Sequence, residues 1–156
     1  MVFGRAGECC EACHAARDPD RKVWMEAHER WAYDDAQQMQ TLRRLICLCT
    51  SCHRATHFGL AQVRGQDDEA LAHLMQVNRW TQRQAQSHVD DALALWRRRS
   101  AIDWRLDFTV LTGAGIRLNP PPAASDRRSV AASIASEVRP VEQPARRGLF
   151  RRRRAG

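Results

Sequence analysis

The residues of this chain best suited to chemistry are two pairs of cysteines, each pair separated by two residues. The pairs are Cys10 with Cys13 and Cys49 with Cys52. Thiolates at this spacing bind Zn²⁺, and two such pairs supply the four ligands of a tetrahedral structural site. A metal bound in this way joins distant segments and contributes directly to folding. We therefore expect a structural Zn²⁺ held by these four cysteines.

The six cysteines of the chain are also compatible with three disulfide bonds in a secreted protein. The N-terminus lacks the sustained apolar stretch of a secretory signal, and closely spaced pairs beside histidines favour metal binding. Cys9 is an alternative ligand to Cys10, but only Cys10 has the two-residue gap to Cys13. We expect Cys47 to be a small buried hydrophobic residue. Because no apolar stretch is long enough to span a membrane, we expect a soluble, cytoplasmic protein.

Two histidines, His53 and His57, follow the second cysteine pair and lie four residues apart. Residues at this spacing are neighbours on one face of a helix, so both imidazoles can bind the same ion. Because four cysteines complete the zinc site, neither histidine is needed there. His28 lies on a strand expected to run beside this helix and adds a third imidazole. Three imidazoles, or two with a carboxylate, hold a divalent ion and leave coordination positions open for water.

The elements that must position these ligands are two strands followed by a helix. The predicted order is a strand over residues 23–29, a polar connection over 32–40 and a strand over 41–49. A hydroxyl residue, Thr50 or Ser51, is expected to cap the helix that follows. A glycine is expected to end it, either Gly59 or Gly65. The cysteine pairs then lie in the loops outside the strands.

Downstream of residue 66 the pattern becomes helical. Asp67 begins an acidic first turn, which a helix N-terminus favours, and Thr81 and Gln84 have the spacing of a capping box. Alternating apolar and polar residues over 104–111 predict a short strand. The tryptophans are expected in the core rather than as stacking platforms for bases. They are Trp24, Trp31, Trp80, Trp96 and Trp104.

The positive charge of the chain is concentrated at its C-terminal end. Residues 1–118 hold 16 Lys and Arg against 15 Asp and Glu, whereas residues 119–156 hold 9 against 3. The nearly neutral body is therefore not a general nucleic-acid surface, although a local basic patch is compatible with it. The Pro-, Ala- and Arg-rich end is expected to be disordered. Its arginines, Arg146, Arg147 and 151–154, suit a DNA contact, a solubilising terminus or an anionic membrane surface.

The sequence around these ligands resembles that of the HNH (His-Asn-His) endonucleases. The similar segments are 25–29 (MEAHE) and 44–57 (RLICLCTSCHRATH), within residues 8–60. In the second segment, Leu-Cys-x-x-Cys-His-x-x-x-His matches the family pattern throughout. The resemblance implies a ββα-metal fold, often with a zinc held by four cysteines. It places the two cysteine pairs on the zinc positions, and His53 and His57 on helix positions that bind the catalytic metal.

Two positions differ from the family pattern. The family has a metal ligand followed by a general-base histidine at the end of its first strand. One alignment puts His28 on the ligand position and Glu29 on the base position; the other makes His28 the base and leaves Ala27, which cannot coordinate. We prefer the first, because it keeps three metal ligands and a carboxylate can serve as a base. Arg44 stands where the family has its middle Asn, and it is expected to pair with Glu29 or a phosphate.

The sequence thus predicts an α+β chain in three parts: a zinc-bound HNH-like module over residues 1–62, a helical extension over 63–118 and an Arg-rich tail over 119–156. The resemblance implies hydrolysis of phosphodiester bonds in DNA, with a second divalent ion, Mg²⁺, Mn²⁺, Ni²⁺ or Zn²⁺, at the histidines. Imidazole ligands favour the transition metals among these. The alternative is a zinc module that has lost catalysis and binds nucleic acid or a protein. A protein-interaction adaptor built on the helices after residue 66 is a third interpretation.

Overall fold

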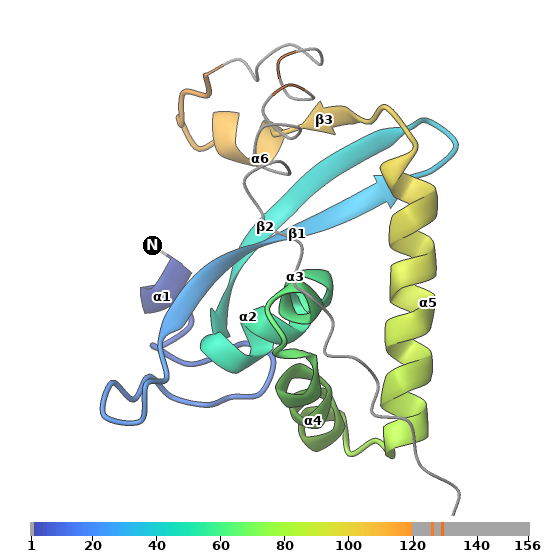
Figure 1. Ribbon diagram of the computed structural model, residues 1–156. Helices are drawn as coiled ribbons and strands as arrows, with labels where there is room; N and C mark the ends of the chain where they lie inside the picture. Colours follow the sequence, from blue (N-terminus) through green and yellow to red (C-terminus); the bar gives the residue numbers. More distant parts are fainter. Residues whose placement is uncertain (1, 120–125, 127–128, 130–156) are drawn as a thin grey trace, which may run out of the picture. The chain divides into compact units, whose positions relative to one another are not determined.

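The computed structural model describes residues 2–119, 126 and 129 of the chain. The chain divides into two units, Met1–Leu118 and Asn119–Gly156, and every element described here belongs to the first. Its described part has a mixed α+β fold with three strands and six helices (Figure 1). Most of the expected Arg-rich tail, including Arg146, Arg147 and residues 151–154, lies outside the described residues.

A long antiparallel hairpin forms the centre of this unit. Strand β1 (Met25–Asp34) pairs with β2 (Met39–Cys49), and the register runs from Met25 opposite Cys49 to Asp34 opposite Met39. An irregularity between Arg30 and Trp31 shifts the register. The short strand β3 (Arg105–Asp107) runs parallel to the start of β2, so β2 lies in the middle of the sheet.

The strands are longer than the hydrophobic pattern indicates. The polar connection expected over residues 32–40 is mostly strand, and only residues 35–38 lie outside β1 and β2. The Asp34 carboxylate accepts a hydrogen bond from the backbone N–H of Gln37, and Gln38 takes a left-handed conformation with φ of 52°. These features make a tight turn, so polar residues on an exposed hairpin extend the ladder instead of forming a loop.

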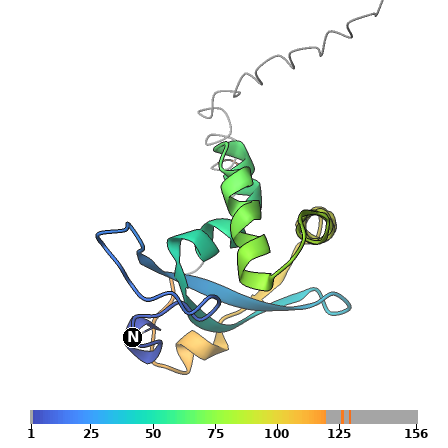
Figure 2. The ribbon, with the colours of Figure 1, turned by 90° about the horizontal axis from the view of Figure 1, so that it is seen from below.

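Helices lie on both faces of the hairpin. Figure 2 shows α2 (Thr50–Thr56) and α4 (Asp67–Asn78) on one side of the strands, with α1 (Val2–Arg5) and α6 (Thr109–Thr112) on the other. The remaining helices are α3 (Phe58–Val63) and α5 (Gln82–Ser100). Because β2 is covered on both faces, its end from Ile46 to Cys49 is buried without alternation.

The ends of the helices agree with the sequence patterns in part. Helix α4 begins at Asp67 as predicted, and the capping box of Thr81 and Gln84 at the start of α5 is confirmed. The cap of α2 is neither Thr50 nor Ser51, because the Cys49 sulfur accepts the hydrogen bond from the backbone of Cys52. Thr50 instead hydrogen-bonds through its hydroxyl to the backbone of Trp24, which ties the start of α2 to the segment before β1.

Further corrections concern the glycines and the last strand. Helix α2 ends at Thr56 with His57 as its C-cap, before Gly59, which lies inside α3. Gly65, with φ of 66°, follows the C-cap of α3. The strand expected over residues 104–111 covers only Arg105–Asp107. It stops there because the Asp107 carboxylate accepts hydrogen bonds from the backbone and hydroxyl of Thr109, which turns the chain into α6.

The core is small and contains no tryptophan among the described residues. Its cluster consists of Ile46, Leu48, Cys10, Cys49 and Cys52, with Cys13, Val23 and Met25 packed against it. Trp24 and Trp96 are 47% and 63% exposed, and the other three tryptophans are half-buried. The expectation of tryptophans in the core is therefore wrong. Cys47 is fully buried, as expected.

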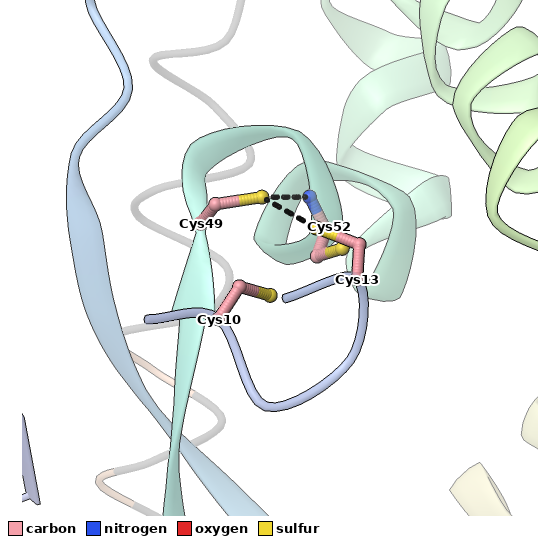
Figure 3. A group of neighbouring side chains, drawn as sticks. All are labelled: Cys10, Cys13, Cys49 and Cys52. Carbon is pink, nitrogen blue, oxygen red and sulfur yellow. Dashed lines mark hydrogen bonds between the residues drawn. The ribbon is translucent and has the colours of Figure 1, made fainter. Parts of the chain in front are cut away.

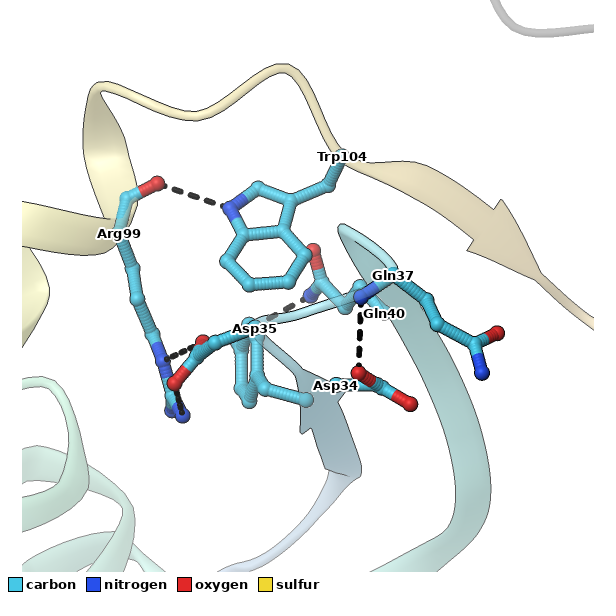
Figure 4. A network of polar contacts seen from close by, with 7 residues as sticks. Asp34, Asp35, Gln37, Gln40, Arg99 and Trp104 are labelled. Carbon is cyan, nitrogen blue, oxygen red and sulfur yellow. Dashed lines mark hydrogen bonds and ion pairs between the residues drawn. The ribbon is translucent and has the colours of Figure 1, made fainter.

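Helix α5 is fixed to the tip of the hairpin at its C-terminal end (Figure 4). The Arg99 guanidinium makes two hydrogen bonds to the Asp35 carboxylate, at 3.0 and 3.1 Å, and lies over the Tyr33 ring. The indole N–H of Trp104 donates to the backbone carbonyl of Arg99 at 2.8 Å. No helix in the described part of the chain combines the length and the apolarity that a membrane span requires.

Candidate metal centres

The sulfurs of Cys10, Cys13, Cys49 and Cys52 all lie within 4.8 Å of one another. Figure 3 shows these side chains converging from the N-terminal loop, the end of β2 and the start of α2. Cys13 Sγ is 3.6 Å from Cys49 Sγ, and three of the four residues are buried. The cluster is therefore placed to hold a metal ion such as zinc, with the four sulfurs that a tetrahedral site requires.

Backbone contacts hold the first cysteine pair against β2. The N–H of Glu11 donates to the carbonyl of Cys47 at 2.8 Å, and the N–H of Cys47 donates to the Glu11 carboxylate at 2.7 Å. Glu11, which lies in the turn between Cys10 and Cys13, is therefore bound directly to β2. The second cysteine pair is positioned by regular secondary structure, because Cys49 is the last residue of β2 and Cys52 lies in the first turn of α2.

The four thiols differ in their tendency to ionise. Burial opposes ionisation of Cys10, but hydrogen bonds from backbone N–H groups, including those of Cys13 and Cys49, outweigh it and lower its pKa to about 7. Burial raises the pKa of Cys13 to about 11, and burial likewise raises the pKa of Cys52. Because metal binding requires thiolates, binding at all four sulfurs releases protons.

A histidine outside the expected ligand set touches this cluster. His73 of α4 places its Nε2 atom 3.1 Å from the sulfur of Cys52. When Nε2 carries the proton, it donates to the sulfur and offsets part of the charge of a thiolate. No pattern in the sequence indicated this contact, because His73 is an isolated histidine on an amphipathic helix. A second link between α2 and α4 is the ion pair of Arg54 with Glu69.

The second group of candidate ligands contains His28, His53 and His57, and their ligand nitrogens also lie within 4.8 Å of one another. The ring centroid of His28 is 5.4 Å from that of His53 and 4.9 Å from that of His57, and the last two are 4.6 Å apart. The structure thus brings together all three histidines singled out in the sequence. His53 lies in α2 and His57 is its C-cap residue, so the two histidines are one helical turn apart at the end of this helix.

The environment of His28 and His57 favours the neutral forms of these two imidazoles. Burial, followed by the charges of His57 and His53, lowers the pKa of His28; burial and the charge of His53 lower the pKa of His57. Neutral imidazole is the form that binds metal. The Nδ1 atom of His28 is buried and has no hydrogen-bond partner in the described structure. Such an atom is costly to bury unless a ligand satisfies it, so this donor set fits a bound cation.

Glu26 is a functional candidate that the sequence patterns did not single out. Its Oε2 atom lies 2.9 Å from Nδ1 of His53. Glu26 precedes His28 by two residues on β1, so both side chains project from the same face of the strand. A carboxylate at Nδ1 fixes the tautomer and orientation of an imidazole, which leaves Nε2 free to bind a metal. The alternation of strand residues was the signal that could have found it.

Glu29 and Arg44, the other two residues that the sequence singled out, are not part of the group of three histidines. Glu29 follows His28 directly and is exposed. Its charge is still near enough to oppose the lowering of the pKa of His28 and His57 that burial causes. Arg44 pairs with Glu11 at 2.7 Å, whereas we expected Glu29 or a phosphate. This pair joins the middle of β2 to the first cysteine loop.

Comparisons with known proteins do not assign the chain to a family. No protein-family model, curated protein or solved structure matches it. The similarity to HNH endonucleases therefore remains a sequence-based prediction.

Proposed function

We propose that this chain is an HNH-type endonuclease that hydrolyses phosphodiester bonds in DNA. The observation that carries the proposal is the convergence of His28, His53 and His57 from a strand and the helix that follows the hairpin. The adjoining cysteine cluster supports it, because in this scheme its Zn²⁺ holds the N-terminal loop, β2 and α2 together. The order β1, β2, α2, which carries the three histidines together with Cys49 and Cys52, also supports the proposal, because the resemblance implies a ββα arrangement.

The donor set suits a second divalent ion. His28, His53 and His57 would hold it, and the buried, unpartnered Nδ1 of His28 is the atom that most needs such a ligand. A bound divalent ion supplies positive charge against the negative charge that develops on the phosphate during hydrolysis. Three imidazoles favour Mn²⁺, Ni²⁺ or Zn²⁺ over Mg²⁺, which prefers oxygen ligands.

Two glutamates and one arginine have the remaining roles in this proposal. Glu26 orients His53 through the contact at Nδ1 and keeps the ring in one tautomer. Glu29, adjacent to His28, accepts the proton of the attacking water, the role that the preferred alignment gives it. Arg44 acts structurally, since its contact with Glu11 stabilises the loop that carries Cys10 and Cys13.

Plasmid nicking by the purified full-length chain tests the proposal. We expect cleavage with Mn²⁺, Ni²⁺ or, more weakly, Mg²⁺, and loss of cleavage by at least about 100-fold in His57→Ala, because one of three ligands is removed. His14→Asn is the matched control. It removes an exposed imidazole outside both clusters, and Asn tolerates the left-handed φ of 62° found there. A folded, zinc-loaded protein that cleaves with none of these metals would exclude a nuclease.

The alternative function is a zinc module that binds nucleic acid or a protein without cleaving. One observation favours it: Arg44, at the position expected for the Asn that orients the base, is engaged with Glu11. This alternative predicts one zinc per chain, and nucleic-acid binding that persists in His53→Ala. Metal analysis and a binding titration of that variant separate it from the nuclease.

A further inference from the structure

A groove with a volume of about 950 Å³ begins beside the histidine cluster. One side is formed by α2 and α3 and includes His57; α4, α5 and Ala12 of the N-terminal loop form the rest. Figure 1 shows α5 running from the end of α4 toward the tip of the hairpin. A volume near 1,000 Å³ is at the upper end of the range for ligand sites. The groove is thus large enough for a ligand and opens onto a proposed metal ligand.

The wall that α5 contributes is fixed to the hairpin at its C-terminal end, and its N-terminal part packs against the segment just before the helix. At the N-terminal end the ring of His88 lies 5.0 Å from that of Trp80, which precedes the helix. At the C-terminal end Arg99 is fixed to Asp35 by two hydrogen bonds. Between these points the apolar side chains of α5 become more exposed to solvent along the helix: Val89 is buried, Leu93 is half-buried and Trp96 is exposed.

The chemistry of the lining indicates the charge of the ligand. Among the described residues that line the groove, none is acidic, although nearly half of the charged residues in 1–118 are acidic. The lining includes Arg97 and three histidines, His57, His73 and His88. Aromatic side chains, Phe58 and Trp96, lie among aliphatic residues such as Leu60 and Val63. A ligand that carries negative charge and flat apolar rings matches this lining.

We propose that the groove binds unpaired bases of single-stranded DNA and leads the strand to the histidine cluster, an inference that rests on the proposed nuclease function. Bases in a duplex stack on one another and expose only their edges, so an indole can stack on a base only where the strand is unpaired. Trp96 provides the stacking surface, and Arg97 pairs with a phosphate. The substrate is therefore a strand with a single-stranded region, and intact duplex is bound less well.

A matched pair of tryptophan variants tests this inference. We measure the affinity of the full-length protein for a fluorescein-labelled single-stranded oligonucleotide and for its duplex, without added divalent metal so that no strand is cut. We expect tighter binding of the single strand, weakened at least about fivefold by Trp96→Ala and largely kept by Trp96→Phe. Trp24→Ala is the control, because Trp24 is exposed but lies outside the groove. All variants keep the C-terminal arginines, so their contribution cancels.

The outcomes separate this inference from the proposed function. Nicking activity in a protein that prefers duplex, or whose single-strand affinity is unaffected by Trp96→Ala, overturns the groove and leaves the nuclease. Binding that depends on Trp96 in a protein that never cleaves supports the groove and overturns the nuclease. If Trp96→Ala instead converts a dimer into a monomer in sedimentation and leaves DNA affinity unchanged, the groove is an interface between copies and the inference is wrong.

Discussion

The contact between Glu26 and His53 is the most informative single contact at the histidine cluster. It assigns different roles to two carboxylates that the sequence places three residues apart on one strand. Glu26 shares a face with His28 and touches an imidazole, whereas Glu29 is exposed and affects His28 and His57 through its charge. A carboxylate that orients a ligand and one that accepts a proton should respond differently to neutralisation.

Neutralising each carboxylate in turn distinguishes these roles. We expect Glu26→Gln to weaken Mn²⁺ binding at the histidines by about 10- to 100-fold, because His53 loses the carboxylate that orients its ring. Cleavage should then be recovered at high Mn²⁺. We expect Glu29→Gln to lower kcat without changing the Mn²⁺ requirement, because a base has been removed. Titration of nicking rate against Mn²⁺ concentration measures both. If high Mn²⁺ rescues Glu29→Gln, the two assignments are reversed.

At the scale of elements, one glutamate holds the first cysteine loop to the hairpin. Glu11 accepts hydrogen bonds from the backbone of Cys47 and from Arg44, both at 2.7 Å. Its pKa is lowered mainly by the Arg44 hydrogen bond, then by that from Cys47. The two contacts differ in exposure: Arg44 lies half in solvent, whereas Cys47 is fully buried. Their contributions to stability should therefore be unequal.

Substitutions on the two sides of this contact measure the inequality. We expect Glu11→Ala to lower the free energy of unfolding by about 1–3 kcal/mol, because the buried N–H of Cys47 loses its carboxylate acceptor. We expect Arg44→Ala to cost at most about 1 kcal/mol, since an exposed ion pair contributes little. Urea denaturation of the zinc-loaded proteins gives both values. Equal losses would mean that the ion pair, and not the backbone contact, holds the loop.

At the scale of the whole molecule, the cysteines form much of the core. Three of the five residues in the buried cluster, Cys10, Cys49 and Cys52, are also proposed metal ligands. With so small a core, apolar burial by itself contributes little stability, as is general for small domains. The N-terminal loop, the hairpin and α2 should accordingly depend on the metal for their association.

Removal of zinc tests this dependence. We expect a strong chelator, or Cys52→Ser, to abolish the cooperative thermal unfolding transition of the hairpin. Part of the helical circular dichroism should persist, because α5 has 19 residues and its own capping box. Metal analysis before and after chelation is the control. A zinc-free protein that unfolds at the same temperature would show that the four sulfurs do not hold the fold together.

Local patterns in the sequence were enough to predict the features that depend only on residues close together in the chain. The two cysteine spacings, the start of α4 at Asp67 and the capping box of Thr81 and Gln84 are of this kind, because a few backbone dihedrals determine each of them. The hairpin was predicted, but its length was not. Its turn at residues 35–38 is set by one side-chain contact and one left-handed residue, which hydrophobic patterning does not describe.

The sequence by itself determined which residues form the two clusters, since the cysteine pairs and histidines carry their chemistry in type and spacing. Only the tertiary structure decided their neighbours: Glu26 at His53, His73 at Cys52 and Arg44 at Glu11. It also decided that Trp96 is exposed along a groove and not buried. The physical reason is that spacing along the chain fixes local geometry, whereas strand register and helix packing choose which distant side chains meet.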